Sequence, residues 1–301
     1  MSTFLRPALY LFLSLGVYVP GTLSAQAPAQ AEKCESHPPH LHANLWMQTS
    51  AEYQALCHQT FNAALNEVKQ AVRSAKVRGG RPVGSGKKPL AVVADLDETI
   101  LDNARFQSEM DTAVSFNCKD RGYSPERWKQ WEKENADEVG LVPGAGSFIS
   151  EVEKLKVVMV YLSNRLEEQK ESTIRALAHN GVNTQGLWEG TERLLLKRET
   201  SNKQDRIRLT EEKYQVVAYL GDNLADFPGA TEETKDVAKL LAARLQKMES
   251  AATLWGTRWF MLPNPVYGDW EHTLPTTVSE RIQLLRHSSR PGFAQVPNLP
   301  Q

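Results

Sequence analysis

A group of acidic side chains follows directly on an apolar segment near residue 95. Asp95, Asp97 and Glu98 come after Leu90–Ala94, whose uninterrupted apolar character is typical of a parallel strand buried on both faces. Ligands of open α/β sheets bind outside the carboxyl ends of the strands, so the order of residues places Asp95 and Asp97 in a crevice. Two ionised carboxylates this close repel each other unless a divalent cation lies between them, and their hard oxygen donors favour Mg²⁺.

Two further apolar segments end in a similar way. Val216–Leu220 runs into Asp222 and Asp226, and Val157–Leu162 runs into Ser163-Asn164-Arg165. A polar strand-to-helix turn with an Asp or Thr N-cap would explain the ending at residues 95–99 if it stood alone. Two separated apolar segments that both end in acids favour a single site. The third segment, Val157–Leu162, lies between them in sequence, and the hydroxyl of Ser163 and the amide of Asn164 that follow it are suited to holding a phosphoryl group.

The polar endings resemble signatures of a known family. Asp95–Asn103 (DLDETILDN) and Gly221–Phe227 (GDNLADF) are similar to the two motifs of the bacterial class C acid phosphatases and 5′-nucleotidases of the lipoprotein e type, in the haloacid dehalogenase superfamily. The resemblance extends to Ser163–Arg165, Pro143–Ala145 and Leu262–Glu271, and so covers most of residues 90–271. It implies an α/β fold, with a Rossmann-like parallel sheet flanked by helices and a small, mainly helical cap.

The resemblance also implies a mechanism. Asp95 attacks phosphorus and forms an aspartyl phosphate, which divides one difficult displacement into two easier ones. Asp97 protonates the leaving oxygen and then takes a proton from water, which suits an acidic pH optimum. The expected metal ligands are Asp95, Asp222 and Asp97, the last through its backbone carbonyl. Asp226 is expected to orient Asp222 or a bound water.

Four more residues are expected to bind the phosphoryl group. Thr99, Ser163 and Asn164 are the candidate hydrogen-bond donors, and Lys203 supplies the positive charge, with Lys197 as the alternative lysine. Ordinary solvated turns are the competing explanation for Ser163, Asn164 and Lys203 when each is taken singly.

Two aromatic residues are expected to grip the rest of the substrate. The family has aromatic side chains that enclose a nucleobase or other ring at the motif positions of Phe106 and Tyr267, although its signature usually has Tyr where this chain has Phe106. Packing in the core or in a loop is the alternative for both rings.

The elements that must position these residues follow from the hydrophobic pattern. The segment 104–142, in which Trp128 and Trp131 share a helix face, is expected to form the cap over the crevice. The Gly- and Lys-rich segment 78–88 is expected to be a surface linker, because it precedes the strand and lacks the order of a phosphate-binding loop. Helices are predicted near residues 46–75, 146–155, 166–180, 204–212, 231–249 and 276–287, and further strands at 194–196 and 259–262.

The global composition limits the possible partners. The 301 residues include 35 Lys and Arg against 36 Asp and Glu, a balance that gives no reason to expect a nucleic-acid polymer as partner. One domain is expected over residues 46–287, with the cap as an insertion at about 104–142.

The ends of the chain are expected to lie outside this domain. Residues 1–25 have the basic start, apolar middle and small-residue end of a cleaved signal peptide, with an uncleaved membrane anchor as the alternative. No Cys adjoins the small-residue motif, which argues against a lipid anchor and for a periplasmic or secreted protein. Residues 26–45 are expected to be a flexible arm and residues 288–301 a flexible tail.

The three cysteines allow at most one internal disulfide in an oxidising compartment. Cys34 and Cys57 are the nearer pair in sequence, but pairing with Cys118 stays open. His37, His40 and His42 could form a transition-metal site, although the Pro-Pro break between them favours a loose arm.

The sequence therefore predicts a Mg²⁺-dependent acid phosphatase acting on small phosphomonoesters, including nucleoside 5′-monophosphates. The alternatives are a sugar-phosphate phosphatase or phosphotransferase that uses the same Asp95, and a non-catalytic storage or binding protein. Because Asp95 and its partner residues are all present, the sequence favours an enzyme. The physiological substrate and the oligomeric state are left open.

Overall fold

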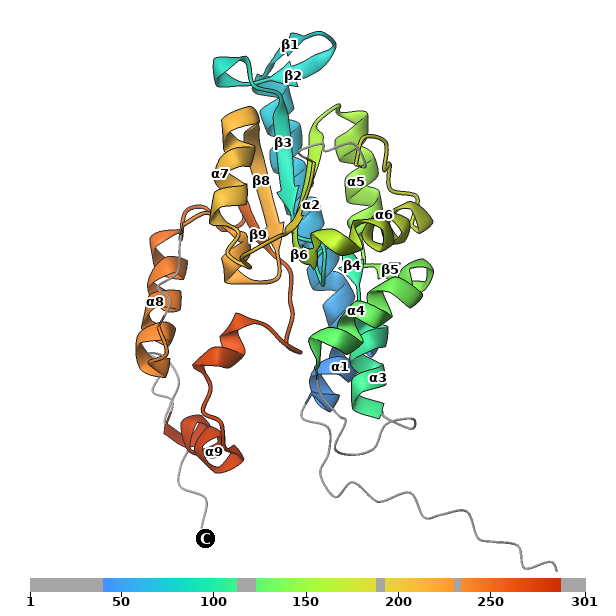
Figure 1. The fold of residues 1–301 in the computed structure, drawn as a ribbon. Helices are drawn as coiled ribbons and strands as arrows, with labels where there is room; N and C mark the ends of the chain where they lie inside the picture. The colour runs from blue at the N-terminus through green and yellow to red at the C-terminus, as the bar shows by residue number, and fades with distance from the viewer. Residues whose placement is uncertain (1–39, 113–122, 188–192, 230–233, 288–301) are drawn as a thin grey trace, which may run out of the picture. The chain divides into compact units, whose positions relative to one another are not determined.

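A five-stranded parallel sheet organises the chain (Figure 1). The computed structural model describes residues 40–112, 123–187, 193–229 and 234–287. Its strand order is β7-β6-β3-β8-β9, and every neighbouring pair is parallel. The strands are β3 (Leu90–Ala94), β6 (Val158–Leu166), β7 (Leu194–Lys197), β8 (Gln215–Gly221) and β9 (Trp259–Met261). The predicted α/β class and all five predicted strands are confirmed.

The central strand β3 is covered on both faces. All five of its residues are buried, and they alternate between two hydrophobic clusters, as the two-residue period of a strand requires. Val92 belongs to the cluster that includes Phe61 and Phe148, whereas Val93 belongs to the one that includes Ile207. Phe61 lies on α2 (Ala51–Ser74), Phe148 on α5 (Ala145–Lys154) and Ile207 on α7 (Gln204–Lys213). Helices therefore flank both faces of the sheet.

The register brings the polar strand endings to one edge. Ala94, the last residue of β3, lies opposite Tyr161 of β6 and Leu220 of β8. The next backbone amide, that of Asp95, still donates to the carbonyl of Leu220 at 3.0 Å. The residues that follow on all three strands are therefore neighbours in space.

The remaining helices agree with most of the predicted ranges. They are α1 (Leu41–Thr49), α3 (Ala104–Thr112), α4 (Pro125–Glu134), α6 (Lys170–His179), α8 (Val237–Ser250) and α9 (Val278–His287). Short 3₁₀ turns are η1 (Ser85–Lys87), η3 (Ala136–Glu138), η4 (Glu167–Gln169), η5 (Leu224–Asp226) and η6 (Asp269–Thr273). None of the helices in the described part of the chain is long and apolar enough to cross a membrane.

The N-terminal helical region differs from the prediction. The single helix predicted for residues 46–75 is two helices, because Ser50 takes an extended conformation and caps α2 through a bond from the Tyr53 amide to Ser50 Oγ at 3.1 Å. The first helix begins at Leu41 and buries Asn44 and Met47, so the end of the arm expected over residues 26–45 is helical and packed.

Two other segments also differ in detail. The linker predicted at residues 78–88 contains an antiparallel hairpin of β1 (Lys76–Arg78) and β2 (Arg81–Val83). Gly79 and Gly80 supply the positive φ angles of 55° and 72° that its two-residue turn needs. The helix predicted from residue 166 starts later, because β6 runs to Leu166 before η4 and α6.

The segment predicted as a cap is mainly helical where the structure describes it. It contains α3, α4, η3 and the short strand β5 (Gly140–Leu141), which pairs with β4 (Leu101–Asp102) just after the Asp95 loop. Residues 113–122 lie outside the described part, as do Cys34, Cys118, His37, the predicted signal peptide and the predicted tail. Cys57 is buried in the core, and the disulfide pairing stays a prediction.

Candidate active site

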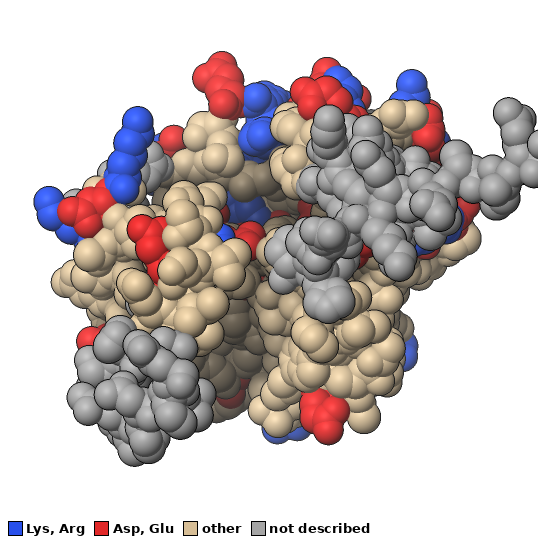
Figure 2. Space-filling view, turned by 90° about the horizontal axis from the view of Figure 1, so that it is seen from below, with Lys and Arg blue, Asp and Glu red and all other residues tan. Residues whose placement is uncertain are grey.

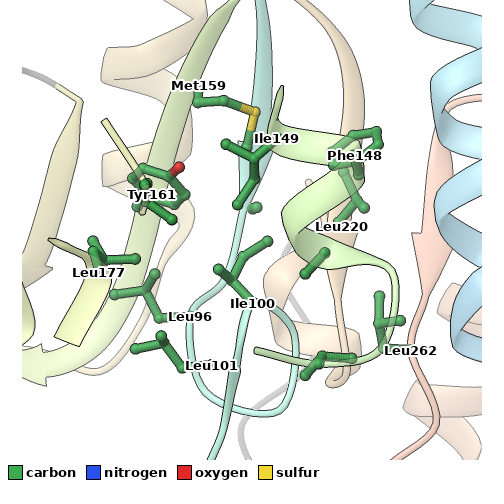
Figure 3. Packing of buried hydrophobic residues seen from close by; sticks show 14 of the residues in the cluster. Leu96, Ile100, Leu101, Phe148, Ile149, Met159, Tyr161, Leu177, Leu220 and Leu262 are labelled. Carbon is green, nitrogen blue, oxygen red and sulfur yellow. The ribbon is translucent and has the colours of Figure 1, made fainter. Parts of the chain in front are cut away.

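The loop after β3 is anchored by its apolar residues. The carbonyl of Leu96 accepts bonds from the amides of Ile100 and Leu101, both at 2.8 Å, and all three side chains are buried in the cluster that holds Phe148 (Figure 3). Glu98 takes a left-handed conformation with φ 53°, which is uncommon for a residue other than glycine. The tight turn between these anchors fixes where the acidic side chains project.

Three carboxylates meet at the end of the sheet. One oxygen from each of Asp95, Asp222 and Asp226 lies within 4.8 Å of the others. The buried Nζ of Lys203 donates to Asp95 Oδ1 at 2.5 Å and to Asp226 Oδ1 at 2.7 Å. The structure thus brings Lys203 to Asp95, as predicted, whereas the alternative Lys197 ends β7, with β6 between it and β3.

Burial controls the electrostatics of this cluster. It raises the pKa of Asp95 well above its usual value, the neighbouring Asp226 and Asp222 raise that pKa further, and Lys203 opposes the shift. Burial and the neighbouring Asp226 likewise raise the pKa of Asp222 to about 7. Although burial opposes its charge, the two bonded carboxylates raise the pKa of Lys203, which stays protonated. One lysine beside three carboxylates leaves an excess of negative charge that a cation would balance.

Asp222 is held by two neighbours. Thr99 Oγ1 donates to Asp222 Oδ1 at 3.1 Å, and Asn264 Nδ2 donates to Oδ2 at 2.9 Å. Because a hydroxyl group has a single proton to donate, Thr99 as placed here orients Asp222 and does not point a donor at a phosphoryl group, which differs from its predicted role. Asn264, from the loop after β9, was not among the predicted site residues.

The Asp226 side chain lies against the last residue of β8, Gly221. Its Oδ2 accepts from the backbone amide of Asn223 at 2.8 Å within a capping box at η5. The side chain passes so close to Gly221 that a Cβ there would lie 2.3 Å from the Asp226 Cβ. Only glycine at position 221 leaves room for Asp226 to reach Lys203.

Asp97 lies in a separate environment. Its Oδ1 accepts from Arg165 Nε at 2.9 Å, Arg165 Nη2 at 2.7 Å and Asn103 Nδ2 at 2.9 Å. Asp226, and not the Asp97 side chain, completes the group of three carboxylates that could share an ion. Coordination through the backbone carbonyl of Asp97 stays a prediction. Asp95 and Asp97 are only two residues apart, but their carboxylates pair with different basic side chains: Asp95 with Lys203 and Asp97 with Arg165.

Ser163 and Asn164 lie on opposite sides of β6. Ser163 is buried, and its Oγ lies 3.4 Å from Asp97 Oδ2. The next side chain points the other way, as strand geometry requires, so that Asn164 is exposed and its Oδ1 accepts from Arg206 Nη2 at 2.6 Å. The structure thus joins Ser163 to the site but does not bring the Asn164 side chain to Asp97.

The two predicted substrate rings have different surroundings. Phe106 is only 4% exposed and packs against Trp128 and Trp131 at ring-centroid distances of 4.9 and 5.4 Å, so the alternative of core packing holds for it. Tyr267 is half-buried, and its amide bonds to Asn264 Oδ1 at 3.3 Å. Since Asn264 also binds Asp222, Tyr267 lies on the loop that reaches the acidic cluster.

Arg165 is the main residue that sequence reasoning missed. It lies two residues after Ser163 on the same strand, and the alternation of side chains could have placed it on the same face. Seen from the carboxyl ends of the strands, the described surface is hollowed, with charged atoms at its base (Figure 2). The arrangement can offer a carboxylate nucleophile, a second carboxylate for proton transfer and a place for a cation.

The chain is similar to known proteins over most of its length. Residues 22–270 match the family model described as HAD superfamily, subfamily IIIB (Acid phosphatase). The class C acid phosphatase from Bacillus anthracis is similar in structure, with 30% identity, a TM-score of 0.66, and coverage of 85% of this chain and 98% of that chain. A crystal structure of the Bacillus anthracis class C enzyme with tungstate bound gives 29% identity and a TM-score of 0.67, with the same coverage.

Proposed function

Because this chain belongs to subfamily IIIB of the HAD superfamily, the acid phosphatases, we propose that it hydrolyses small phosphomonoesters with the help of Mg²⁺ through an aspartyl phosphate on Asp95. The fold and the phosphomonoesterase class follow from the family. The choice of nucleophile, metal and substrate is the proposal. The observation that carries it is the pairing of Asp95 with the buried Lys203 inside a cluster of three carboxylates.

Asp95 is suited to attack phosphorus. Lys203 binds its Oδ1 and leaves Oδ2 free of any hydrogen bond from the described residues, so Oδ2 is the atom that would form the bond to phosphorus. The nucleophile must be ionised, and burial opposes that state, so Lys203 is needed to favour the charged form. The same ammonium group would balance charge on the phosphoryl oxygens.

The acidic cluster fits a divalent cation. Asp95, Asp222 and Asp226 offer only hard oxygen donors within a short range of one another, which is the ligand set that Mg²⁺ prefers. When bound, the ion would neutralise charge on the carboxylates and on the phosphoryl group. Thr99 and Asn264 would keep Asp222 in place for it.

Asp97 is the proposed general acid and base. Arg165 and Asn103 together direct three donors at Oδ1, so that oxygen remains the hydrogen-bond acceptor. Oδ2 has only the Ser163 hydroxyl nearby among the described donors, and is therefore the atom that would give a proton to the leaving oxygen and later take one from water.

The substrate class rests on chemistry and on likeness. Tungstate is an oxyanion similar in shape to phosphate, and the similar Bacillus anthracis enzyme has been crystallised with it. We extend the proposal to nucleoside 5′-monophosphates because of Tyr267, with sugar phosphates or phosphate transfer to another acceptor as the second candidates. The signal-peptide pattern supports a periplasmic or secreted location, which N-terminal sequencing of the mature protein would test.

One assay tests the proposed function. Release of inorganic phosphate is measured from nucleoside 5′-monophosphates, sugar phosphates, glycerol phosphate and an aryl phosphate across acidic to alkaline pH, with Mg²⁺ present. We expect turnover of several of these esters with an optimum below neutrality. If no ester in the panel is hydrolysed by the folded protein at any pH, the proposed function is wrong.

Tyr267→Ala is expected to weaken nucleotide binding selectively. A ring that stacks on a nucleobase is worth ~1–3 kcal/mol, so KM for a nucleoside 5′-monophosphate should rise roughly five- to a hundredfold. KM for glycerol phosphate, which has no ring, should change little. Steady-state kinetics on both substrates provide the measurement.

Phe106→Ala serves as the comparison for Tyr267→Ala. Because Phe106 is buried against two tryptophans, its loss should lower thermal stability and reduce activity on both substrates alike. Equal losses on both substrates for Tyr267→Ala would show that this ring also has a structural role only.

A further inference from the structure

Helix α4 contacts Arg165 with two side chains one turn apart. The Arg165 guanidinium carbon lies 5.5 Å from the centre of the Trp128 ring, and its Nε lies 3.3 Å from Glu132 Oε1. Both residues come from the segment predicted as a cap, whereas Arg165 lies near the end of a strand of the sheet. The contact thus joins the helical insertion to the base of the site.

Glu132 is an unusual residue for a helix surface. It is 1% exposed, and neither of its carboxylate oxygens accepts a hydrogen bond from any residue that the structure describes. Burial raises its pKa to about 7 against the opposing effect of Arg165. Burying a carboxylate with so few partners costs stability, and buried ion pairs seldom stabilise a protein more than apolar residues would. A contribution to folding alone does not account for Glu132.

The guanidinium group of Arg165 is confined on several sides. Asp97 and Asn103 accept its bonds on the side of the nucleophile loop, Trp128 covers its face, and Glu132 contacts Nε. Since Arg165 provides two of the three donors at Asp97 Oδ1, the orientation of the Asp97 carboxylate depends on where this guanidinium lies.

Helix α4 is itself held in place. Gln169 Nε2 donates to the carbonyl of Lys129 at 2.7 Å, and Arg175 Nη2 donates to the carbonyl of Lys133 at 2.6 Å. Gln169 is in η4 and Arg175 in α6, the two elements that follow β6 in the chain. Glu132 lies between Lys129 and Lys133 on α4, so these two bonds fix the position of its carboxylate relative to β6.

We propose that Glu132 is a positioning residue for proton transfer: by holding Arg165 from the side of α4, it fixes the direction in which Asp97 Oδ2 faces the leaving oxygen. The inference rests on the proposed role of Asp97 as general acid. It follows that α4 contributes a side chain that orients the catalytic groups, in addition to lying beside the active site. Displacements of about 1 Å at a reacting group can cost on the order of 10²-fold in rate, so a small shift of Arg165 is sufficient.

The test uses Glu132→Gln and two substrates that differ in their leaving group. Glycerol phosphate has a poor alkoxide leaving group and needs the proton from Asp97, whereas p-nitrophenyl phosphate has a good leaving group and needs it less. Hydrolysis of the aspartyl phosphate is common to both substrates, so the comparison uses kcat/KM, which reports only the step in which the leaving group departs. We expect kcat/KM on glycerol phosphate to fall roughly 10- to 100-fold and kcat/KM on p-nitrophenyl phosphate to fall less than about threefold. The ratio of the two values on one preparation does not depend on the fraction of folded enzyme.

Two further variants sharpen the result. Glu134→Gln, on the exposed side of the same helix, should leave both rates unchanged. Glu132→Asp keeps the carboxyl group and should recover part of the ratio that Glu132→Gln loses. Equal losses on both substrates for Glu132→Gln, or no recovery with Glu132→Asp, would overturn the inference.

Asp97→Asn separates this inference from the proposed function. If Asp97→Asn shows the selective loss on glycerol phosphate and Glu132→Gln does not, the positioning role is wrong and the general acid stands. If Asp97→Asn itself reduces both values of kcat/KM equally, the assignment of Asp97 as the general acid is wrong, and the positioning role falls with it.

Discussion

Asp95→Asn is expected to reduce kcat by roughly 10⁴- to 10⁶-fold, because losses of this size follow the removal of an enzyme's nucleophile. The amide has nearly the shape of the carboxylate but cannot form the acyl phosphate. Phosphate release from an aryl phosphate, followed over hours, measures the effect. The variant should still fold, since Lys203 retains its bond to Asp226 and the repulsion among the three carboxylates decreases.

Two controls accompany this experiment. Asp205→Asn changes an aspartate whose side chain is 81% exposed on α7 and should keep full activity. The thermal midpoint of Asp95→Asn should lie within about 4 °C of the parent protein, the shift that ~1 kcal/mol produces in a domain of this size. Turnover by folded Asp95→Asn within about tenfold of the parent rate would exclude Asp95 as the nucleophile.

Removal of divalent cations is expected to abolish activity, and Mg²⁺ to restore it. Burial holds the pKa of Asp222 at about 7, so without a cation this carboxyl is partly protonated at neutral pH and the cluster is incompletely charged. Activity after dialysis against a chelator, and its recovery on titration with Mg²⁺, give the measurement. Full activity in excess chelator would show that the carboxylates work without a metal.

Thr99→Val extends this prediction to a residue that does not bind the ion itself. Loss of the hydroxyl removes one of the two groups that hold Asp222, and changes of this kind typically cost about 10- to 100-fold in metal affinity. The Mg²⁺ concentration for half-maximal activity should rise accordingly. Thr210→Val is the matched control, because Thr210 is also buried but bonds the carbonyl of Arg206 within α7. An unchanged Mg²⁺ requirement in Thr99→Val would contradict the role of Thr99.

The sequence alone determined the fold class and the position of the site. An unbroken apolar strand such as Leu90–Ala94 can be stable only between two layers, and its carboxyl end must face the crevice of an open sheet. For this reason the order of residues was sufficient to place Asp95, Ser163 and Asp222 at one edge. The resemblance to the family then favoured Lys203 over Lys197, a choice that hydrophobic periodicity alone could not make.

Helix boundaries were less well determined. The apolar pattern runs on through α1 and α2, and only the extended backbone of Ser50 separates them. Capping of this kind depends on a single hydrogen bond, worth about 1 kcal/mol, and many serines that form no cap occur in similar contexts.

Only the tertiary structure decided which partner each polar group takes. Thr99 and Asp222 are 123 residues apart, and the bond between them redirects a hydroxyl that the sequence assigned to the phosphoryl group. Asp226 joins the acidic cluster, and the Asp97 side chain stays apart from it, because Lys203 and Arg165 meet these two carboxylates from other strands and loops. Glu132, which no motif contains, reaches Arg165 only because α4 packs against η4 and α6, the elements that follow β6. Local sequence sets the type and direction of a side chain, but hydrogen bonds between distant segments depend on how the layers pack, and that packing is the sum of many weak contacts spread over the whole chain.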